Sequence, residues 1–233
     1  MQALLSLDGF MFELRWVHFL AGVTWIGLLY YFNFVQGSFF AEADASTKSN
    51  CIQKLVPRAL WWFRWSAMFT FLSGILIIGL TLHQLGMGAL TSSWGILIST
   101  GAFLATLMWA NVWFVIWPNQ KVVIASATQV AKGGQALPQA AASAAKAATA
   151  SRTNTMFSIP MLFFMGAARH LSGFQVGETA NLGLAAIVVV GIILLLELNS
   201  LFGKQGPMTT IKGVIACGFA LWAVLYGTLD LLL

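Results

Sequence analysis

Six long apolar segments constrain this chain more than any other feature. They cover residues 15–36, 59–82, 94–117, 153–171, 182–201 and 208–229. Each is close to the ~20 residues that a helix needs to cross the hydrocarbon core of a bilayer. Only 8% of the residues are charged, whereas soluble domains average about 25%. We therefore predict an all-α integral membrane protein, a single transmembrane domain over residues 1–233 in which six helices form a bundle within the lipid bilayer.

Basic residues are distributed unevenly between the two ends of this predicted bundle. The connections after the first, third and fifth segments lie at one end of the bundle. This end carries ten of the twelve basic residues, namely Lys48, Lys54, Arg58, Arg64, Lys121, Lys132, Lys146, Arg152, Lys204 and Lys212. The opposite end carries Arg15 and Arg169. Because loops rich in Lys and Arg remain in the cytoplasm, we predict that both termini lie outside. Topology thus explains the net charge of +5 without a nucleic-acid partner.

The connection between the third and fourth segments is long and rich in alanine. It contains KVVIASATQVAK and PQAAASAAKAATAS, which are strong helix formers, separated by Gly133, Gly134 and Pro138. We predict a cytoplasmic helical hairpin over residues 119–152 that extends helices three and four. A mobile low-complexity linker is the alternative.

Polar residues in the first segment share one side of the predicted helix. At about 100° per residue they fall within an arc of roughly 80°, and the stripe consists of Arg15, His18, Gly22, Trp25, Leu29, Asn33 and Gln36. Polar side chains are costly in hydrocarbon. We therefore expect this polar stripe to face protein or a cofactor.

Three histidines, His18, His83 and His170, are predicted near the outer end of the bundle. Neutral imidazole commonly ligates b-type haem or copper. His18 is the candidate metal ligand because it lies on the polar stripe, and Gly22 one turn deeper leaves room for a flat macrocycle. The alternative is structural: His83 and His170 end their helices at the interface, and His18 hydrogen-bonds to a neighbour. No CxxCH motif is present, which excludes a covalently attached haem c.

A second polar cluster is predicted near the inner end. Its members are Asn33, Gln36, Asn111, Asn119, Gln120, Arg152, Asn154, Glu197 and Asn199. Glu197 lies well within an apolar segment, where a carboxylate needs a partner such as Arg152 or an asparagine. The candidate residues for binding a polar, planar substrate are Asn33, Gln36, Asn111, Arg152, Asn154 and Glu197. The alternative is a hydrogen-bonded plug that joins the helices.

These stretches resemble a known family. The strings HFLAGVTWIGLLYYFNFVQ, RWSAMFTFLSGILIIG, NVWFVIWPNQK and ASRTNTMFSIPMLFFM are similar to the membrane domain of the bacterial membrane-anchored urate oxidases, which are fused to a cytochrome c. The resemblance covers about residues 16–170. The last two helices are similar to the family only in their general character and not in specific strings. The matching polar positions are His18, Asn33, Gln36, Asn111, Asn119, Gln120, Arg152 and Asn154.

The resemblance implies oxidation of urate to 5-hydroxyisourate in a bacterial inner membrane, in which the distribution of basic residues places both termini on the periplasmic side. Since these 233 residues contain no haem-c motif, we expect a separate cytochrome c or a quinone to accept the electrons. The alternative is a non-catalytic accessory subunit of a larger respiratory or photosynthetic membrane complex. A transporter would require an inverted repeat or broken helices, and Pro160 is the one such irregularity in the predicted helices.

Overall fold

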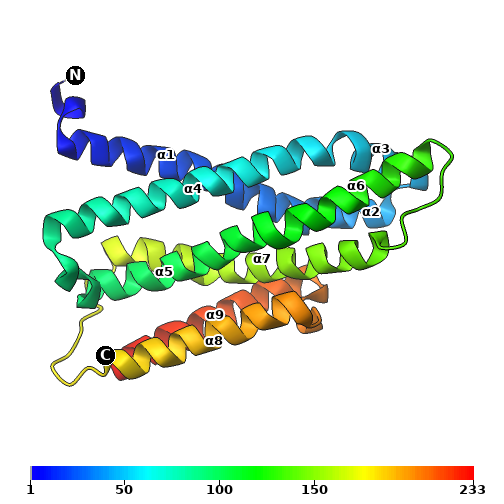
Figure 1. Ribbon diagram of the computed structural model, residues 1–233. Helices are drawn as coiled ribbons and strands as arrows, with labels where there is room; N and C mark the ends of the chain where they lie inside the picture. Colours follow the sequence, from blue (N-terminus) through cyan, green and yellow to red (C-terminus); the bar gives the residue numbers. More distant parts are fainter. Residues whose placement is uncertain (1) are drawn as a thin grey trace.

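The computed structural model describes residues 2–233, and all regular structure within them is helical (Figure 1). The α-helices are α1 (Leu7–Tyr30), α2 (Gly37–Glu42), α3 (Ala45–Lys54), α4 (Val56–Leu85), α5 (Ser93–Ala110), α6 (Trp117–Ala131), α7 (Ala140–His170), α8 (Leu182–Phe202) and α9 (Ile211–Leu232). Two π-helical segments, η2 (Tyr31–Gln36) and η4 (Asn111–Ile116), continue α1 and α5 without a break. Short 3-10 turns are η1 (Gln2–Leu5), η3 (Met87–Thr91) and η5 (Gly206–Thr209). The all-α class is confirmed.

Local sequence fixes where these helices begin and end. The hydroxyls of Ser6, Ser92 and Thr210 each accept a hydrogen bond from the backbone N–H three residues later, which caps the first turns of α1, α5 and α9. The helix α4 ends at Gly86, whose φ of 80° is the conformation that glycine adopts without steric cost. Pro160 lies inside α7, and that helix continues through it as one element.

Five helical stretches are long and apolar enough to cross a membrane. They are Leu7–Glu42, Val56–Leu85, Ser93–Ala131, Leu182–Phe202 and Ile211–Leu232. They correspond to the first, second, third, fifth and sixth predicted segments, and they expose large apolar side chains that suit contact with lipid. The first begins at Leu7 and not at residue 15, so Arg15 lies within the helix and not at its start.

The predicted fourth segment, 153–171, is the C-terminal part of α7, which is 31 residues long but less apolar than the other five. It packs along α5 and α9 and also contacts α1, α6, α8, η2 and η4. Every residue from 153 to 158 is buried. Because six consecutive positions cover all sides of a helix, protein surrounds α7 at this level, and the helix needs no apolar side for lipid.

Two helices at the basic end complete the architecture. The helices α6 and α7 lie side by side, and residues 132–139 join them (Figure 1). The backbone N–H of Leu137 donates to the hydroxyl of Ser126, which fixes this turn. Residues 45–54 form α3, a helix that we did not predict, and it packs against α4 and α6.

Asp44 caps the N-terminus of α3. Its carboxylate accepts hydrogen bonds from the hydroxyl and the backbone N–H of Thr47 and from the backbone N–H of Ser46. These bonds, with the Thr47 hydroxyl contributing most, hold the pKa of Asp44 well below its usual range. The pattern of Asp followed by Ser and Thr is a helix-start signal that the sequence did contain.

Candidate functional site

A buried network of two asparagines and one glutamate joins three helices at the inner cluster. The Asn111 amide nitrogen donates to Asn154 Oδ1 and to Glu197 Oε2, both at 3.0 Å. The Asn154 amide nitrogen donates in turn to the backbone carbonyl of Met108 at 2.9 Å. Asn111, Asn154 and Glu197 are 1%, 0% and 8% exposed. The predicted need of Glu197 for a partner is confirmed, and an asparagine fills that role.

The position of Glu197 follows from the buried side of α8. This side consists of Ala185, Val189, Ile193, Glu197 and Ser200. The spacing of four, four, four and three residues is that of one helix face. Glu197 therefore points into the bundle, as Ile193 does on the same side of α8. Unlike the apolar Ile193, the buried carboxylate needs a hydrogen bond, and the network supplies it.

A second set of hydrogen bonds connects α7 to the first helix. The amide nitrogen of Asn33 donates to Ser151 Oγ at 2.8 Å and to the carbonyl of Leu29 at 2.9 Å. Three residues before Asn33, the hydroxyl of Tyr30 lies 2.9 Å from Ser158 Oγ. The polar stripe is thus confirmed in its deeper half, where Trp25, Leu29 and Asn33 are buried.

Both asparagines that reach α7 lie in π-helical segments. Asn33 is within η2 and Asn111 begins η4. A π turn inserts an extra residue and shifts the side chains that follow it around the helix axis, and such turns are frequent at functional sites. The asparagine amides of the two segments therefore hydrogen-bond to the same stretch of α7, residues 151–154.

The other predicted members of the inner cluster do not join this network. Arg152 Nη1 donates to the carbonyl of Met208 at 3.2 Å and not to Glu197. Asn119 donates to the carbonyl of Val115 in its own helix. Asn199 is exposed and donates to the carbonyl of Lys204, and Gln120 is half-buried.

Three buried polar atoms on the helical segments that carry Asn33, Asn154 and Glu197 have no hydrogen-bond partner among the described residues. They are Gln36 Oε1, Thr153 Oγ1 and Ser200 Oγ. Gln36 lies three residues from Asn33, Thr153 adjoins Asn154, and Ser200 lies three residues from Glu197. An unpaired polar atom in the protein interior costs about 1–3 kcal/mol. These atoms are therefore where a ligand or water could bind, and sequence reasoning missed two of them, Thr153 and Ser200.

His18 has a defined environment on the polar stripe. Its Nδ1 lies 3.0 Å from Ser73 Oγ of α4. The ring packs over Gly74, where an added Cβ would lie 3.2 Å from His18 Cε1. The hydrogen bond at Nδ1 orients the imidazole and leaves Nε2 for a ligand, as in metal-ligating histidines.

The structure does not bring the three histidines together. His83 is ten residues beyond Ser73 on α4, about 15 Å along the helix axis, and it is exposed in the last turn. His170 is the exposed last residue of α7. Among residues 2–233 no group of three or more His, Cys, Asp or Glu side chains could hold a metal. The three histidines therefore do not form one shared metal site in the part of the chain that the structure describes.

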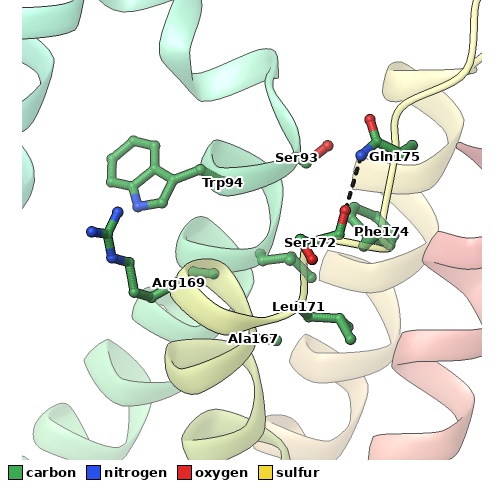
Figure 2. Close-up of a pocket in the computed structure, with 10 residues that line it drawn as sticks. Ser93, Trp94, Ala167, Arg169, Leu171, Ser172, Phe174 and Gln175 are labelled. Carbon is green, nitrogen blue, oxygen red and sulfur yellow. Dashed lines mark hydrogen bonds between the residues drawn. The ribbon is translucent and has the colours of Figure 1, made fainter.

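A cavity at the outer end lies between the start of α5 and the end of α7. Its volume is about 220 Å³, below the ~300–1,000 Å³ of typical ligand pockets. Figure 2 shows Trp94 and Arg169 on one side and Ser172 and Gln175 on the other, with the Gln175 amide donating to the Ser172 carbonyl at 2.9 Å. His170 does not line it. The cavity suits a small ion or water and not a macrocycle or a purine.

Comparison with known proteins identifies one family. A family model described as urate oxidase N-terminal matches residues 79–225, more than half of the chain. The matched region contains α5 to α8 and most of α9, and thus Asn111, Arg152, Asn154 and Glu197. The stretch with His18, Asn33 and Gln36 precedes it. No curated protein and no solved structure matches the chain.

Proposed function

Since the chain belongs to the urate oxidase N-terminal family, we propose that it is the membrane part of a redox system that oxidises urate or a closely related purine. The reaction adds one water to urate and yields 5-hydroxyisourate, two protons and two electrons. A separate cytochrome c, reduced twice, or one quinone, reduced to the quinol, takes up the two electrons. The observation that carries this proposal is the family match over the helices that hold the buried network.

In this proposal the unpaired atoms of Gln36, Thr153 and Ser200 recognise the substrate. Urate is planar and anionic, and its edges carry both donors and acceptors. Gln36 Oε1 can accept a hydrogen bond, and the hydroxyls of Thr153 and Ser200 can donate or accept. Arg152 donates one hydrogen bond, from Nη1 to the Met208 carbonyl, so its remaining N–H groups can bind the urate anion and its charge can offset that of the anion.

The membrane arrangement follows from the basic residues. We place six helices across a bacterial inner membrane, with α7 as the enclosed sixth span, both termini periplasmic and the α6–α7 hairpin in the cytoplasm. The substrate site then lies near the cytoplasmic face. His18 and Asn33 are fifteen residues apart on one helix, so the two sites are separated by about 22 Å along its axis.

We propose haem b as the electron carrier held at His18, where it would supply a one-electron redox centre. His18 would hold it through Nε2, while Ser73 fixes the ring through Nδ1. The chain's own contribution there would be the orientation of one imidazole.

The test measures urate consumption by the reconstituted protein, with cytochrome c or a quinone added in turn. The informative variant is Thr153→Val, which removes the unpaired hydroxyl without changing side-chain shape. Its control is Thr149→Val, one turn away on α7, because the Thr149 hydroxyl is already bonded to the Ala145 carbonyl. We expect Thr153→Val to raise KM severalfold and Thr149→Val to leave KM unchanged.

Equal KM values for both variants would remove Thr153 from the site. A Thr153→Val protein that is more stable and fully active would show that the unpaired hydroxyl is only a defect in packing. Absence of turnover with either acceptor would overturn the proposed reaction.

A second candidate function is a non-catalytic accessory subunit of a larger membrane complex. The observation in its favour is that Asn111, Asn154 and Glu197 bond to one another, as the members of a structural plug would. The peripheral helix α8 also exposes large apolar side chains such as Ile187 and Leu195. A colourless protein that co-purifies with a larger complex from its native membrane would support this function over the first.

A further inference from the structure

Two cations converge on one tryptophan at the inner end of the bundle. The guanidinium carbon of Arg64 lies 3.6 Å from the centroid of the Trp117 ring and 5.6 Å from that of Trp113. The Lys121 ammonium lies 5.6 Å from the same Trp117 ring. Arg64 comes from α4, and the other three residues come from the continuous helix formed by η4 and α6. We call these four residues the Arg64–Trp117 cluster.

The positive charge of this cluster has no carboxylate to offset it. Within residues 2–233, neither Arg64 nor Lys121 forms an ion pair. The Nε of Arg64 donates to the carbonyl of Leu60 at 3.4 Å, and no hydrogen bond occupies its two terminal nitrogens in the described part of the chain. Stacking on Trp117 uses the face of the guanidinium and leaves its edge free, which is the edge that pairs with phosphate oxygens in bidentate fashion.

The depth of the cluster matches the boundary of the hydrocarbon. Residues 65–85 of α4 extend about 32 Å at 1.5 Å per residue, close to the ~30 Å thickness of the core. Arg64 therefore lies at headgroup level when His83, near the other end of α4, lies at the opposite boundary. Around Arg64 on the same helix, Trp61, Trp62 and Trp65 are 48%, 60% and 38% exposed, as in the aromatic belts of membrane interfaces.

We propose that the Arg64–Trp117 cluster binds the headgroup of an anionic phospholipid. The lipid phosphate pairs with the free edge of Arg64 and with Lys121, and it offsets the repulsion between the two cations. The acyl chains run along the exposed apolar surface of α4 beside the tryptophans. Charge complementarity favours a lipid over another protein, because the cluster lies at the level where phosphates are most concentrated.

The experiment uses the full chain in nanodiscs of phosphatidylcholine with or without a quarter of phosphatidylglycerol. Native mass spectrometry counts the lipids that remain bound, and thermal unfolding measures the stabilisation that each lipid provides. The test variants are Arg64→Gln, Lys121→Gln and both together. The matched control is Lys132→Gln, an exposed cation in the α6–α7 turn with no aromatic partner in the structure.

We expect the parent protein and Lys132→Gln to retain phosphatidylglycerol and to unfold at a higher temperature in its presence. Each charge removed from the cluster should weaken retention about fivefold, since a basic residue near an anionic surface contributes about 1 kcal/mol. Should Arg64→Gln fold poorly, Lys121→Gln tests the same prediction, because Lys121 is exposed.

Equal retention by the double variant and the parent would overturn the proposal. An equal loss in Lys132→Gln would do the same, because it would show a general effect of surface charge. Stabilisation by inorganic phosphate as large as that by the lipid would rule out a lipid site. None of these readouts depends on urate turnover.

Discussion

Removal of Asn111 should destabilise the bundle more than removal of Glu197, its acceptor in the buried network. Asn111 is the shared donor, since its amide bonds both Asn154 and Glu197. The substitution Asn111→Leu keeps the branched shape of the side chain and deletes both hydrogen bonds. It leaves Asn154 Oδ1 and Glu197 Oε2 buried without that donor.

The expected loss follows from the number of bonds removed. Interhelical hydrogen bonds in a membrane protein average about 0.6 kcal/mol by double-mutant cycles, with a maximum near 1.7. Loss of two such bonds predicts a decrease of about 1–3 kcal/mol in the free energy of unfolding. Glu197→Leu removes one acceptor and leaves the Asn111–Asn154 bond in place, so it should cost about half as much.

The assay is reversible unfolding in mixed detergent micelles with increasing dodecyl sulfate, followed by circular dichroism. A double-mutant cycle of Asn111→Leu and Glu197→Leu isolates the pairwise term, and we expect a coupling of about 1 kcal/mol. Asn199→Leu is the control, since Asn199 lies two residues from Glu197 but is exposed. A cost for Asn111→Leu no larger than that for the control, or a coupling within error of zero, would refute the reasoning.

Three further predictions concern the outer site, the topology and the helix α3. If haem is bound, His18→Ala should abolish its Soret band while the protein stays in the membrane, and an unchanged spectrum would exclude His18 as the ligand. A reporter enzyme fused after Leu233 should be active in the periplasm, whereas cytoplasmic activity would contradict the proposed topology. The depressed pKa of Asp44 means that its capping contribution is complete above the unfolded-state value of about 3.9 and is lost as pH falls below it. The protection factors of the α3 amides against hydrogen exchange should therefore fall in acid for the parent but not for Asp44→Asn, which caps without titrating.

The sequence predicts the lipid-facing helices well because helices in contact with lipid are rich in apolar residues. Val56–Leu85 and Ile211–Leu232 are apolar on most of their circumference, and a hydropathy window detects that property directly. The polar stripe was predictable for a related reason. Burying Asn33 and Trp25 requires a protein neighbour, and α4 and α7 provide it.

The partners within the inner cluster could not be predicted from the sequence. Spacing along one helix shows which residues share a face, but it does not fix the rotation of one helix against another. Arg152 and Glu197 lie at similar depth, yet Arg152 bonds to the Met208 carbonyl and Glu197 to Asn111. The π-helical segments add to this difficulty, because each shifts the register of the residues that follow it.

The central helix shows why the polar residues of this chain resist interpretation by hydropathy alone. Residues 151–154 of α7 are consecutive and polar, and the rotation of 100° per residue points them to different neighbours. Ser151 meets Asn33 of η2, Arg152 meets the carbonyl of Met208 in η5, and Asn154 meets Asn111 of η4. A helix that is polar on every side can be stable within a bilayer only if protein surrounds it, because lipid offers no hydrogen bonds. The polarity that excludes α7 from the five apolar helices is therefore also the reason that it lies among other helices. The hydroxyl of Thr153 has no hydrogen-bond partner among these contacts, so it is the group on α7 to which an added ligand would bind.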